Sequence, residues 1–301
     1  MSNTIAAIIL TKNEEKHIAR CIGSLKNVCD EVIVVDSFSS DRTCEIAKSH
    51  GAEICRHAFV NHARQFNWAL EHCDIKSEWI WRIDADEYLE GNIGSAVKEA
   101  VKKCDSDVNG IYVRKRIDFM GKPLKHGGWY PTYHLKVFRK GHGECENRWM
   151  DEHIRIFDGK TITVDEGNQV DANLNGLTWW TDKHNHYATR EMIDMLMTEF
   201  ELDAKGQEVI PMFFGTEEQR KRWLKMKYVK APLFVRPFAN FFYRYIIRGG
   251  FLDGKEGFIW HILQGFWYRM LVDAKIFEIK KKFNSNPEAI KEFLKDYLAC
   301  S

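Results

Sequence analysis

The chain has 301 residues, 45% of them hydrophobic and 29% charged, which is the composition of a globular protein of one large or two smaller domains. Its 44 Lys and Arg balance 43 Asp and Glu, and this argues against a dedicated nucleic-acid-binding protein, which is usually basic. No apolar run approaches the ~20 residues of a spanning helix. Eight cysteines without a C-x-x-C pair and an N-terminus without signal-peptide features predict reduced thiols and a cytoplasmic location.

Strand and helix patterns alternate along the first hundred residues. The apolar run 5–10 predicts a buried strand, and apolar residues at helical spacing over 18–25 predict a helix with Asn13 as its N-cap. Further strands are expected at 31–35, 52–56 and 79–83, and further helices at 41–48, 63–72 and 93–103. Strands separated by helices form βαβ crossovers. The pattern therefore predicts an α/β fold, with a mostly parallel sheet and helices on both faces.

The pattern changes after residue 110. Residues 111–115 and 135–139 favour strands, with a loop containing Gly and Trp between them. From Thr178 onward the sequence is typical of helices almost to its end. We therefore expect a helical extension after the α/β region.

Polar residues gather where three of the predicted strands end, in segments 11–15, 36–41 and 84–87. Ligands of open parallel sheets bind at the carboxyl ends of the strands. The G-x-G-x-x-G of a dinucleotide site is missing after the first strand. The carboxylates of Asp84-Ala85-Asp86 could hold Mg²⁺ or Mn²⁺, or could form a capped turn. The two other polar strand ends favour the metal.

These segments together resemble the family 2 glycosyltransferases of the GT-A fold, whose nucleotide-binding region is Rossmann-like. Residues 8–15 resemble the first strand and nucleotide loop of that family, 35–43 its V-D-x-x-S-x-D-x-T signature, and 84–86 its metal-binding D-x-D. Residues 63–69 lie where the family carries an A-R-N-x-G-like helix. Phe38 is a departure, because many members have Gly there.

The resemblance implies a role for each matching residue. Asp36 would hydrogen-bond the nucleotide base, Asp84 the base or ribose, and Asp86 would hold the divalent ion on the donor diphosphate. The remaining donor-binding residues would be Thr11, Asn13, Glu14 and Arg64.

Two later motifs match the family more loosely. In Trp149-Met150-Asp151-Glu152, the residue aligned with the catalytic base is Glu152, with Asp151 as the alternative. Inversion by direct displacement needs a carboxylate that accepts the proton of the acceptor hydroxyl. His186, in Lys183-His184-Asn185-His186-Tyr187, could complete the metal shell. The plainer interpretations are a solvated acidic loop and a helix-capping or core histidine.

The resemblance thus implies an inverting hexosyltransferase that uses a nucleotide sugar, with UDP favoured, and Mn²⁺ or Mg²⁺. Its H-G-G-W-Y, W-x-D-E and K-H-N-x-Y segments resemble bacterial enzymes of lipopolysaccharide-core and surface-polysaccharide synthesis, such as the core heptose β-1,4-glucosyltransferases. We expect a catalytic domain over 1–200, with a donor half at 1–110 and an acceptor half at 111–200, and a helical extension over 201–301. A sugar-phosphate nucleotidyltransferase and an inactive membrane-binding module are the alternatives.

The window 219–252 contains nine Lys or Arg, interleaved with aromatic residues, and no Asp or Glu. Cationic and aromatic side chains on short helices suit an anionic membrane surface. The window therefore predicts peripheral attachment to the cytoplasmic face of the inner membrane, near a glycan or glycolipid acceptor. Plain packing of these helices and a nucleic-acid groove are the alternatives.

Overall fold

The computed structural model describes residues 3–146, 152–200 and 226–300, together with residues 202, 214 and 223. The chain divides into two compact units, a first unit over Met1–Leu174 and a second unit over Asn175–Ser301. The domain boundary expected at residue 200 stays a prediction.

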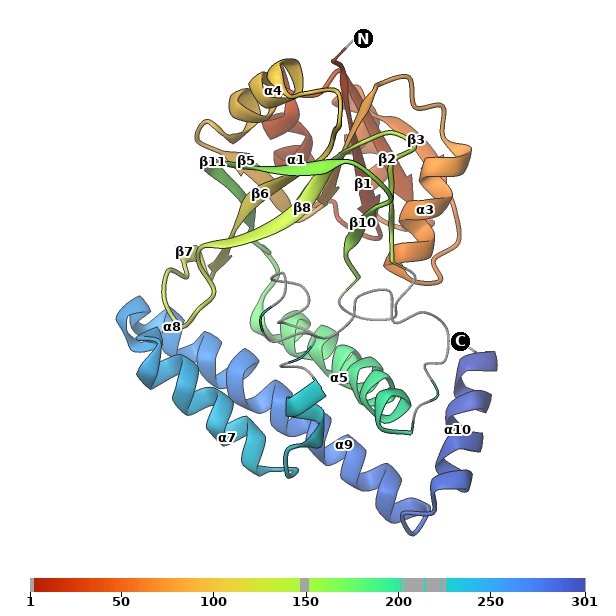
Figure 1. The fold of residues 1–301 in the computed structure, drawn as a ribbon, viewed down its shortest axis with the longest axis vertical. Coiled ribbons are helices and arrows are strands. Elements are labelled where there is room, and N and C mark those ends of the chain that lie inside the picture. The colour runs from red at the N-terminus through yellow and green to blue at the C-terminus, as the bar shows by residue number, and fades with distance from the viewer. Residues whose placement is uncertain are drawn as a thin grey trace. The chain divides into compact units, whose positions relative to one another are not determined.

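In the first unit, strands and helices alternate over the first hundred residues, as the sequence predicts, and six strands follow among the described residues (Figure 1). Its strands are β1 (Ile5–Thr11), β2 (Glu31–Asp36), β3 (Glu53–Arg56), β4 (Trp79–Asp84), β5 (Glu87–Glu90), β6 (Val108–Phe119), β7 (Lys122–Pro123), β8 (Thr132–Arg139), β9 (Gly143–Cys145), β10 (Ile154–Ile156) and β11 (Lys160–Asp171). Its helices are α1 (Ile18–Leu25), α2 (Thr43–Ser49), α3 (His62–His72) and α4 (Ile93–Lys103).

The main sheet has the strand order β3-β2-β1-β4-β8-β6-β11-β5, and β7 pairs with β6 beside it. Strands β1 to β4 are parallel, but β8 is antiparallel to both β4 and β6, and β5 is antiparallel to β11. The α/β fold is confirmed, and the sheet is mixed. The parallel register sets Thr11 opposite Asp36 and Leu10 opposite Asp84, so the predicted polar strand ends lie at one edge.

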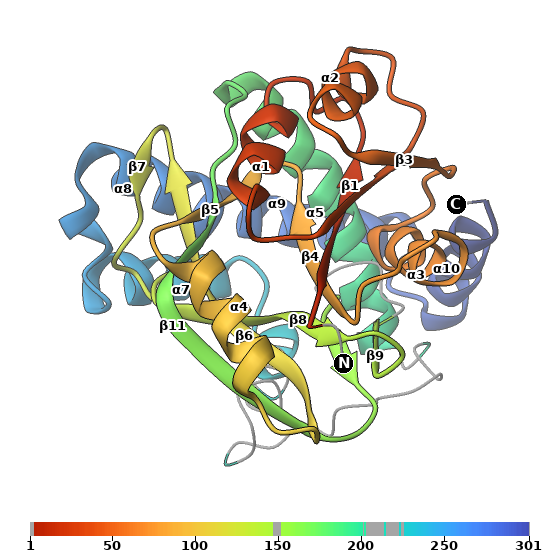
Figure 2. The ribbon, with the colours of Figure 1, turned by 90° about the horizontal axis from the view of Figure 1, so that it is seen from above.

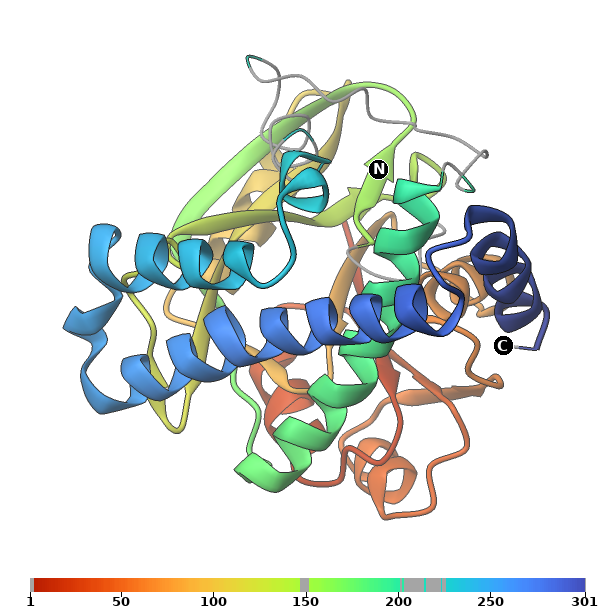
Figure 3. The ribbon, with the colours of Figure 1, turned by 90° about the horizontal axis from the view of Figure 1, so that it is seen from below.

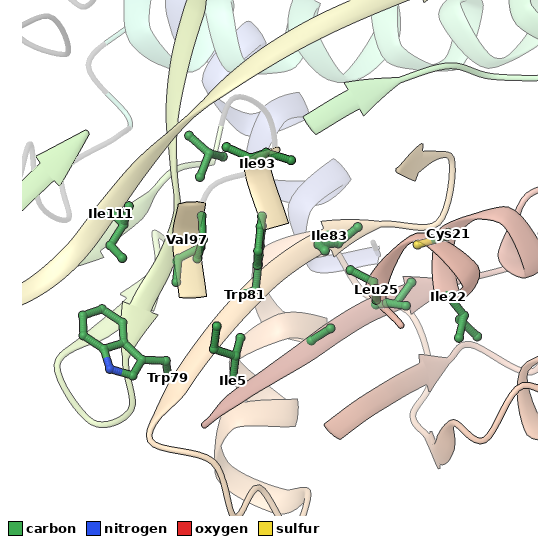
Figure 4. Close-up of a cluster of buried hydrophobic side chains, with 14 of the residues drawn as sticks. Ile5, Cys21, Ile22, Leu25, Trp79, Trp81, Ile83, Ile93, Val97 and Ile111 are labelled. Carbon is green, nitrogen blue, oxygen red and sulfur yellow. The ribbon is translucent and has the colours of Figure 1, made fainter. Parts of the chain in front are cut away.

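Helices cover both faces of this sheet, as predicted (Figure 2). Helices α1, α2 and α4 pack on the face formed by Trp79, Trp81 and Ile83 of β4, and α3 packs on the opposite face. Figure 4 shows side chains of the first of these cores, among them Leu25 of α1, Val97 of α4, and Trp79 and Trp81 of β4. Successive strand residues alternate between the two cores because side chains of a strand point to opposite faces.

The predicted N-cap of the first helix is wrong. The chain makes a turn over 14–17, in which Ile18 N–H donates to Glu14 O at 3.0 Å, and α1 begins only after it. Asn13 instead has a φ of +57° and accepts a hydrogen bond from the next loop. The polar segment after β1 is therefore a longer loop than the pattern indicates.

The second unit is helical. It contains α5 (Leu177–Glu199), α7 (Val235–Phe241), the π-helix η1 (Phe242–Ile247), the 3-10 turn η2 (Gly250–Asp253), α8 (Gly254–Trp260), the π-helix η3 (His261–Trp267), α9 (Tyr268–Lys282) and α10 (Pro287–Cys300). The chain runs out along α7 and η1, turns at η2, and returns along α8, η3 and α9 (Figure 3). Among the helices in the described part of the chain, none is long and apolar enough to cross a membrane.

Candidate active site

The loops after β1 and β2 are bound together around the buried carboxylate of Asp36. Thr11 Oγ1 donates to this carboxylate at 3.0 Å, and Ser39 donates to it through its hydroxyl at 2.5 Å and its backbone N–H at 2.9 Å. Burial raises the pKa of Asp36, but hydrogen bonds, led by those of Ser39, outweigh burial and lower the pKa below its ordinary value. Asp36 therefore stays ionised and fixes both loops. Its contact with a base stays a prediction.

Asn13 and Glu14 join the same two loops. Asn13 N–H donates to Ser39 Oγ at 2.8 Å, and Asn13 Oδ1 accepts from Ser40 N–H at 2.8 Å. Glu14 N–H donates to Thr43 Oγ1 at 2.7 Å. Asn13 and Glu14, which follow β1 and which the family resemblance assigns to nucleotide binding, are therefore hydrogen-bonded to the segment after β2.

Phe38 lies in the turn after β2 with a φ of +58°. This left-handed backbone is the one that glycine adopts at no steric cost, and glycine is what the family resemblance leads us to expect here. Lys12 Nζ donates to the carbonyl oxygens of Ser37 at 2.9 Å and Phe38 at 2.6 Å. Lys12 thus holds the turn from the β1 side. Phe38 therefore has the backbone conformation expected of a glycine and adds an exposed aromatic ring.

Asp84 lies at the end of β4 among positive charges. Lys136 Nζ of β8 is 3.6 Å from Asp84 Oδ2. Desolvation raises the pKa of Asp84, but the charges of Lys136, Arg82 and Lys115 outweigh it and hold the pKa well below its ordinary value. The carboxylate of Asp84 is therefore ionised and already partnered by protein cations.

Asp86 occupies a different environment in the turn between β4 and β5. Its Oδ2 accepts from Asn173 Nδ2 at 3.0 Å. Its backbone oxygen accepts from Arg20 Nη2 at 3.0 Å and from Ala172 N–H at 3.1 Å. The segment after β11 and a side chain of α1 thus hold the turn that carries the predicted metal ligand. The Asp86 carboxylate is left partly exposed.

A buried charge cluster beneath this turn was not predicted from the sequence. Glu87 is fully buried, with Lys115 Nζ 2.9 Å from its Oε1 and Lys136 Nζ 3.4 Å from its Oε2. Lys115 also pairs with Asp171 at 3.0 Å, and Gln169 Nε2 donates to Glu87 Oε2 at 2.5 Å. Desolvation raises the pKa of Glu87, but Lys115 and Lys136 outweigh it and lower the pKa. The sequence signal was a lysine within each of two predicted strands.

Replacing Lys136 with Met should destabilise the first unit by about 3–5 kcal/mol, because it removes a partner of the buried Glu87 carboxylate. Urea unfolding at pH 7 measures this loss, and K26M, at an exposed lysine after α1, is the matched control. The pKa of Glu87 is lowered in the folded state from 4.5. Its stabilising contribution is therefore present above that value and is lost as the pH falls through the folded pKa. K136M should show weaker acid sensitivity below about pH 4.5; unchanged stability of K136M would contradict the assignment.

Glu152, the predicted base, is paired with Arg82 of β4. Arg82 Nη2 is 2.8 Å from Glu152 Oε1, and Arg82 Nη1 is 3.1 Å from Cys145 Sγ. Burial lowers the pKa of Arg82, but Asp84, Cys145 and Glu152 together raise it above its ordinary value. Arg82 thus holds the side chain of Glu152, and the sequence motifs did not predict this contact. Asp151, the alternative base, lies outside the described residues.

His17 ties the first loop to the chain that follows β11. Its Nε2 accepts from Leu174 N–H at 2.8 Å, so Nδ1 carries the proton and donates to Glu14 Oε2 at 2.6 Å. The ring is fully buried. This link holds the predicted donor loop and the segment that carries Asn173 in one arrangement, and the sequence motifs did not predict it.

Two further predicted residues have exposed side chains. Arg64 has an exposed side chain in the first turn of α3, where its backbone N–H donates to Asn61 Oδ1 at 2.8 Å. His186 lies on α5 in the second unit, and its side chain is exposed. Their roles in donor and metal binding stay predictions.

The carboxylates near the end of β4 suit a metal ion that is also coordinated by substrate phosphates. Within residues 3–146, 152–200 and 226–300 there is no group of three or more His, Cys, Asp or Glu side chains arranged for a metal ion. Mg²⁺ is usually held by one or two carboxylates together with substrate phosphates, not by a cage of protein ligands. The partly exposed Asp86 carboxylate fits that pattern, whereas Asp84 is already partnered by Lys136.

Comparison with known proteins identifies the family. Residues 6–157 match the sequence profile described as Glycosyl transferase family 2, which is half of the chain. The chain belongs to glycosyltransferase family 2. The matched region contains the β1 and β2 loops, the end of β4 and Glu152. The resemblance carried by the motifs is therefore confirmed, and the protein is a glycosyltransferase.

Two relatives of this family 2 enzyme match over most of their length. An uncharacterized glycosyltransferase of Rickettsia typhi is 26% identical over 283 residues, which are 92% of this chain and 88% of that protein. The lipopolysaccharide core biosynthesis glycosyltransferase LpsC of Rhizobium meliloti is 26% identical over 280 residues, 91% of this chain and 92% of that protein.

A solved structure supports the GT-A-like fold of this family 2 enzyme. The mannosyltransferase PcManGT of Pyrobaculum calidifontis, solved with GDP-Man and Mn²⁺, matches with a TM-score of 0.51 at 15% identity. The match covers 91% of this chain and 86% of that chain. At this identity the likeness concerns the fold.

Proposed function

We propose that this enzyme transfers a hexose from a nucleotide sugar, with UDP as the favoured nucleotide, to a hydroxyl group of a glycan acceptor with inversion at the anomeric carbon. The main support is that β4 and the turn after it carry the contacts of both proposed groups, the base and the metal ligand. Arg82 of β4 holds Glu152 at 2.8 Å, and four residues further on Asp86 presents a partly exposed carboxylate. The interlocked loops after β1 and β2 end at the same edge of the sheet.

The displacement is a single step in this proposal. Glu152 accepts the proton of the acceptor hydroxyl while that oxygen bonds to the anomeric carbon. The bond from the anomeric carbon to the diphosphate oxygen breaks, and its electron pair leaves with the nucleoside diphosphate. Arg82 positions the Glu152 carboxylate, and Asp151 is the alternative base.

Asp86 would hold Mn²⁺ or Mg²⁺ together with the donor diphosphate, with His186 as a further candidate ligand. When bound, the ion offsets the negative charge that develops on the departing diphosphate. Asn173 and Arg20 contribute by fixing the turn that carries Asp86.

The proposed acceptor is a growing lipopolysaccharide core or another surface glycan on a lipid. The similarity to LpsC over most of both chains supports this. A lipid-linked acceptor suits an enzyme attached to the cytoplasmic face of a membrane, and we propose that the basic and aromatic window 219–252 provides the contact. Arg220, Lys221, Arg222 and Lys225 of that window lie outside the described residues.

Membership of family 2 favours glycosyl transfer over the nucleotidyltransferase alternative. An inactive membrane module is disfavoured because such a module needs neither the Asp86 turn nor a positioned Glu152.

Donor binding tests the proposal. A panel of nucleotide sugars with Mn²⁺ should include one that raises the melting temperature, because a ligand that binds only the folded state stabilises it by about 2.7 kcal/mol at 100 times its Kd. The shift should disappear when EDTA removes the ion. UMP with Mn²⁺, which lacks the diphosphate, is the matched control. No shift with any UDP-, GDP- or dTDP-sugar would contradict the proposed donor class.

A further inference from the structure

Helix α7 and the π-helix η1 carry an apolar stripe on their exposed side. Phe238, Phe242 and Ile246 follow one another at intervals of four residues and are all exposed. A second row alongside includes Tyr243 and Ile247, and Ile247 is 63% exposed. Residues four apart share one face of a helix. The solvent-accessible side of this element is therefore its apolar side.

The side of α7 that packs on the returning helices combines aromatic and polar contacts, with Phe238 and Phe241 against Phe266 of η3 at ring-centroid distances of 4.8 and 6.1 Å. Arg236 and Asp273 of α9 are both buried and joined at 2.7 Å from Nε to Oδ1. Asn240 Nδ2 donates to the backbone oxygen of Gly265 at 2.8 Å, and His261 of η3 is fully buried. Helices on the surface of a water-soluble domain usually turn their polar residues outward, whereas the outward side of α7 and η1 is largely apolar.

Helices α7 and η1 and the returning α8, η3 and α9 form a helical hairpin with η2 as its turn. The apolar stripe continues around this turn. Phe251 and Leu252 of η2 are 50% and 61% exposed.

The exposed Arg248, which follows η1, and the exposed Lys255 of α8 lie close to these residues in the sequence. Residues 226–252 contain no Asp or Glu, and the two acidic residues that follow, Asp253 and Glu256, are buried and half-buried. The exposed charges beside the apolar tip, Arg248 and Lys255, are therefore positive and complement an anionic lipid surface.

We propose that the end of this hairpin, residues 242–252, inserts its apolar side chains into one leaflet of a lipid bilayer. This rests on the membrane contact proposed above and makes it more specific. Burial of exposed apolar side chains drives the attachment, and the exposed Arg248 and Lys255 steer it toward anionic lipid headgroups. A continuous row of exposed apolar side chains on a soluble protein marks an interaction surface. The exposed Arg248 and Lys255 beside this row favour an anionic lipid surface as its partner.

Sedimentation of the full chain with vesicles tests the insertion. The probes are vesicles of phosphatidylcholine alone and of phosphatidylcholine mixed with phosphatidylglycerol. The triple variant I247S/F251S/L252S should bind both kinds of vesicle about tenfold more weakly, because it removes apolar area without changing charge. The triple variant F59S/M120S/F157S changes exposed apolar residues of the first unit, and its binding should remain within about twofold of the unchanged protein.

The double variant R248Q/K255Q, at two exposed cations, separates charge from insertion. It should weaken binding to the mixed vesicles and leave binding to phosphatidylcholine unchanged. Unchanged vesicle binding by I247S/F251S/L252S would overturn the insertion and leave the basic window as the attachment. No vesicle binding by the unchanged protein would overturn the membrane contact altogether.

Sedimentation velocity checks for a different occupant. A dimer of the unchanged protein that dissociates in I247S/F251S/L252S, without vesicle binding, would assign the stripe to a second copy and overturn the proposal. The donor-induced melting shift is measured on the same variants, since the hairpin lies outside the donor-binding residues. If no nucleotide sugar raises the melting temperature of the unchanged protein, the proposed donor binding is contradicted, and the result does not bear on membrane insertion.

Discussion

Replacing Glu152 with Gln should lower the rate of sugar transfer by ~10³-fold and leave donor binding intact. The amide keeps the shape of the carboxylate and can still accept a hydrogen bond from Arg82, which lies 2.8 Å from it. It cannot take the proton of the acceptor hydroxyl. The measurement is the transfer rate at saturating donor, with the donor-induced melting shift recorded on the same sample.

D151N is the matched control for E152Q because it changes the neighbouring carboxylate. If Glu152 is the base, D151N keeps most of the activity. Full activity of E152Q together with inactive D151N would transfer the role of base to Asp151. A third variant, R82K, tests positioning: it should lower kcat more than it changes the KM for the donor, because lysine cannot reproduce the planar guanidinium fork.

Replacing Asp86 with Ala should reduce transfer by about 10²–10³-fold, because it removes the proposed protein ligand of the ion that balances charge on the leaving diphosphate. The turn itself should survive, since Arg20 and Ala172 hold its backbone oxygen and not its carboxylate. The measurement is the transfer rate as a function of Mn²⁺ concentration, with the circular dichroism spectrum as the check on folding.

D74A controls for the loss of a carboxylate, because Asp74 is an exposed residue whose only short ion pair in the described structure is with Lys76 at 3.8 Å. D74A should keep its activity and its Mn²⁺ dependence. Retention of metal-dependent transfer by D86A would assign the ion to other residues.

Much of the parallel half of the sheet was predictable from sequence. The apolar run that became β1 and the helical spacing of Ile18, Cys21 and Leu25 are local signals, and both elements form where they were expected. Asp84 and Asp86 were found because they follow a buried strand directly. Local periodicity suffices for such features, since it reflects which face of an element is buried.

The electrostatic support of the site was not predictable in the same way. Lys136 reaches Glu87 and Asp84 only because β8 inserts beside β4 in the antiparallel sense. Arg82 meets Glu152 across a separation of 70 residues. Strand order and long-range pairing leave no periodic trace in one sequence, so these partners became visible only in the fold.

Identification of the products is the best test of inverting sugar transfer from a nucleotide sugar. The purified enzyme is incubated with Mn²⁺ and the nucleotide sugar that stabilises it, with membranes or lipopolysaccharide core as acceptor, and the released nucleotide and the anomeric configuration of the product are determined by NMR. We expect release of a nucleoside diphosphate and inversion at the anomeric carbon, both lost in E152Q. Retention of configuration would contradict the proposed reaction, as would release of pyrophosphate in a parallel incubation with a nucleoside triphosphate and a sugar phosphate.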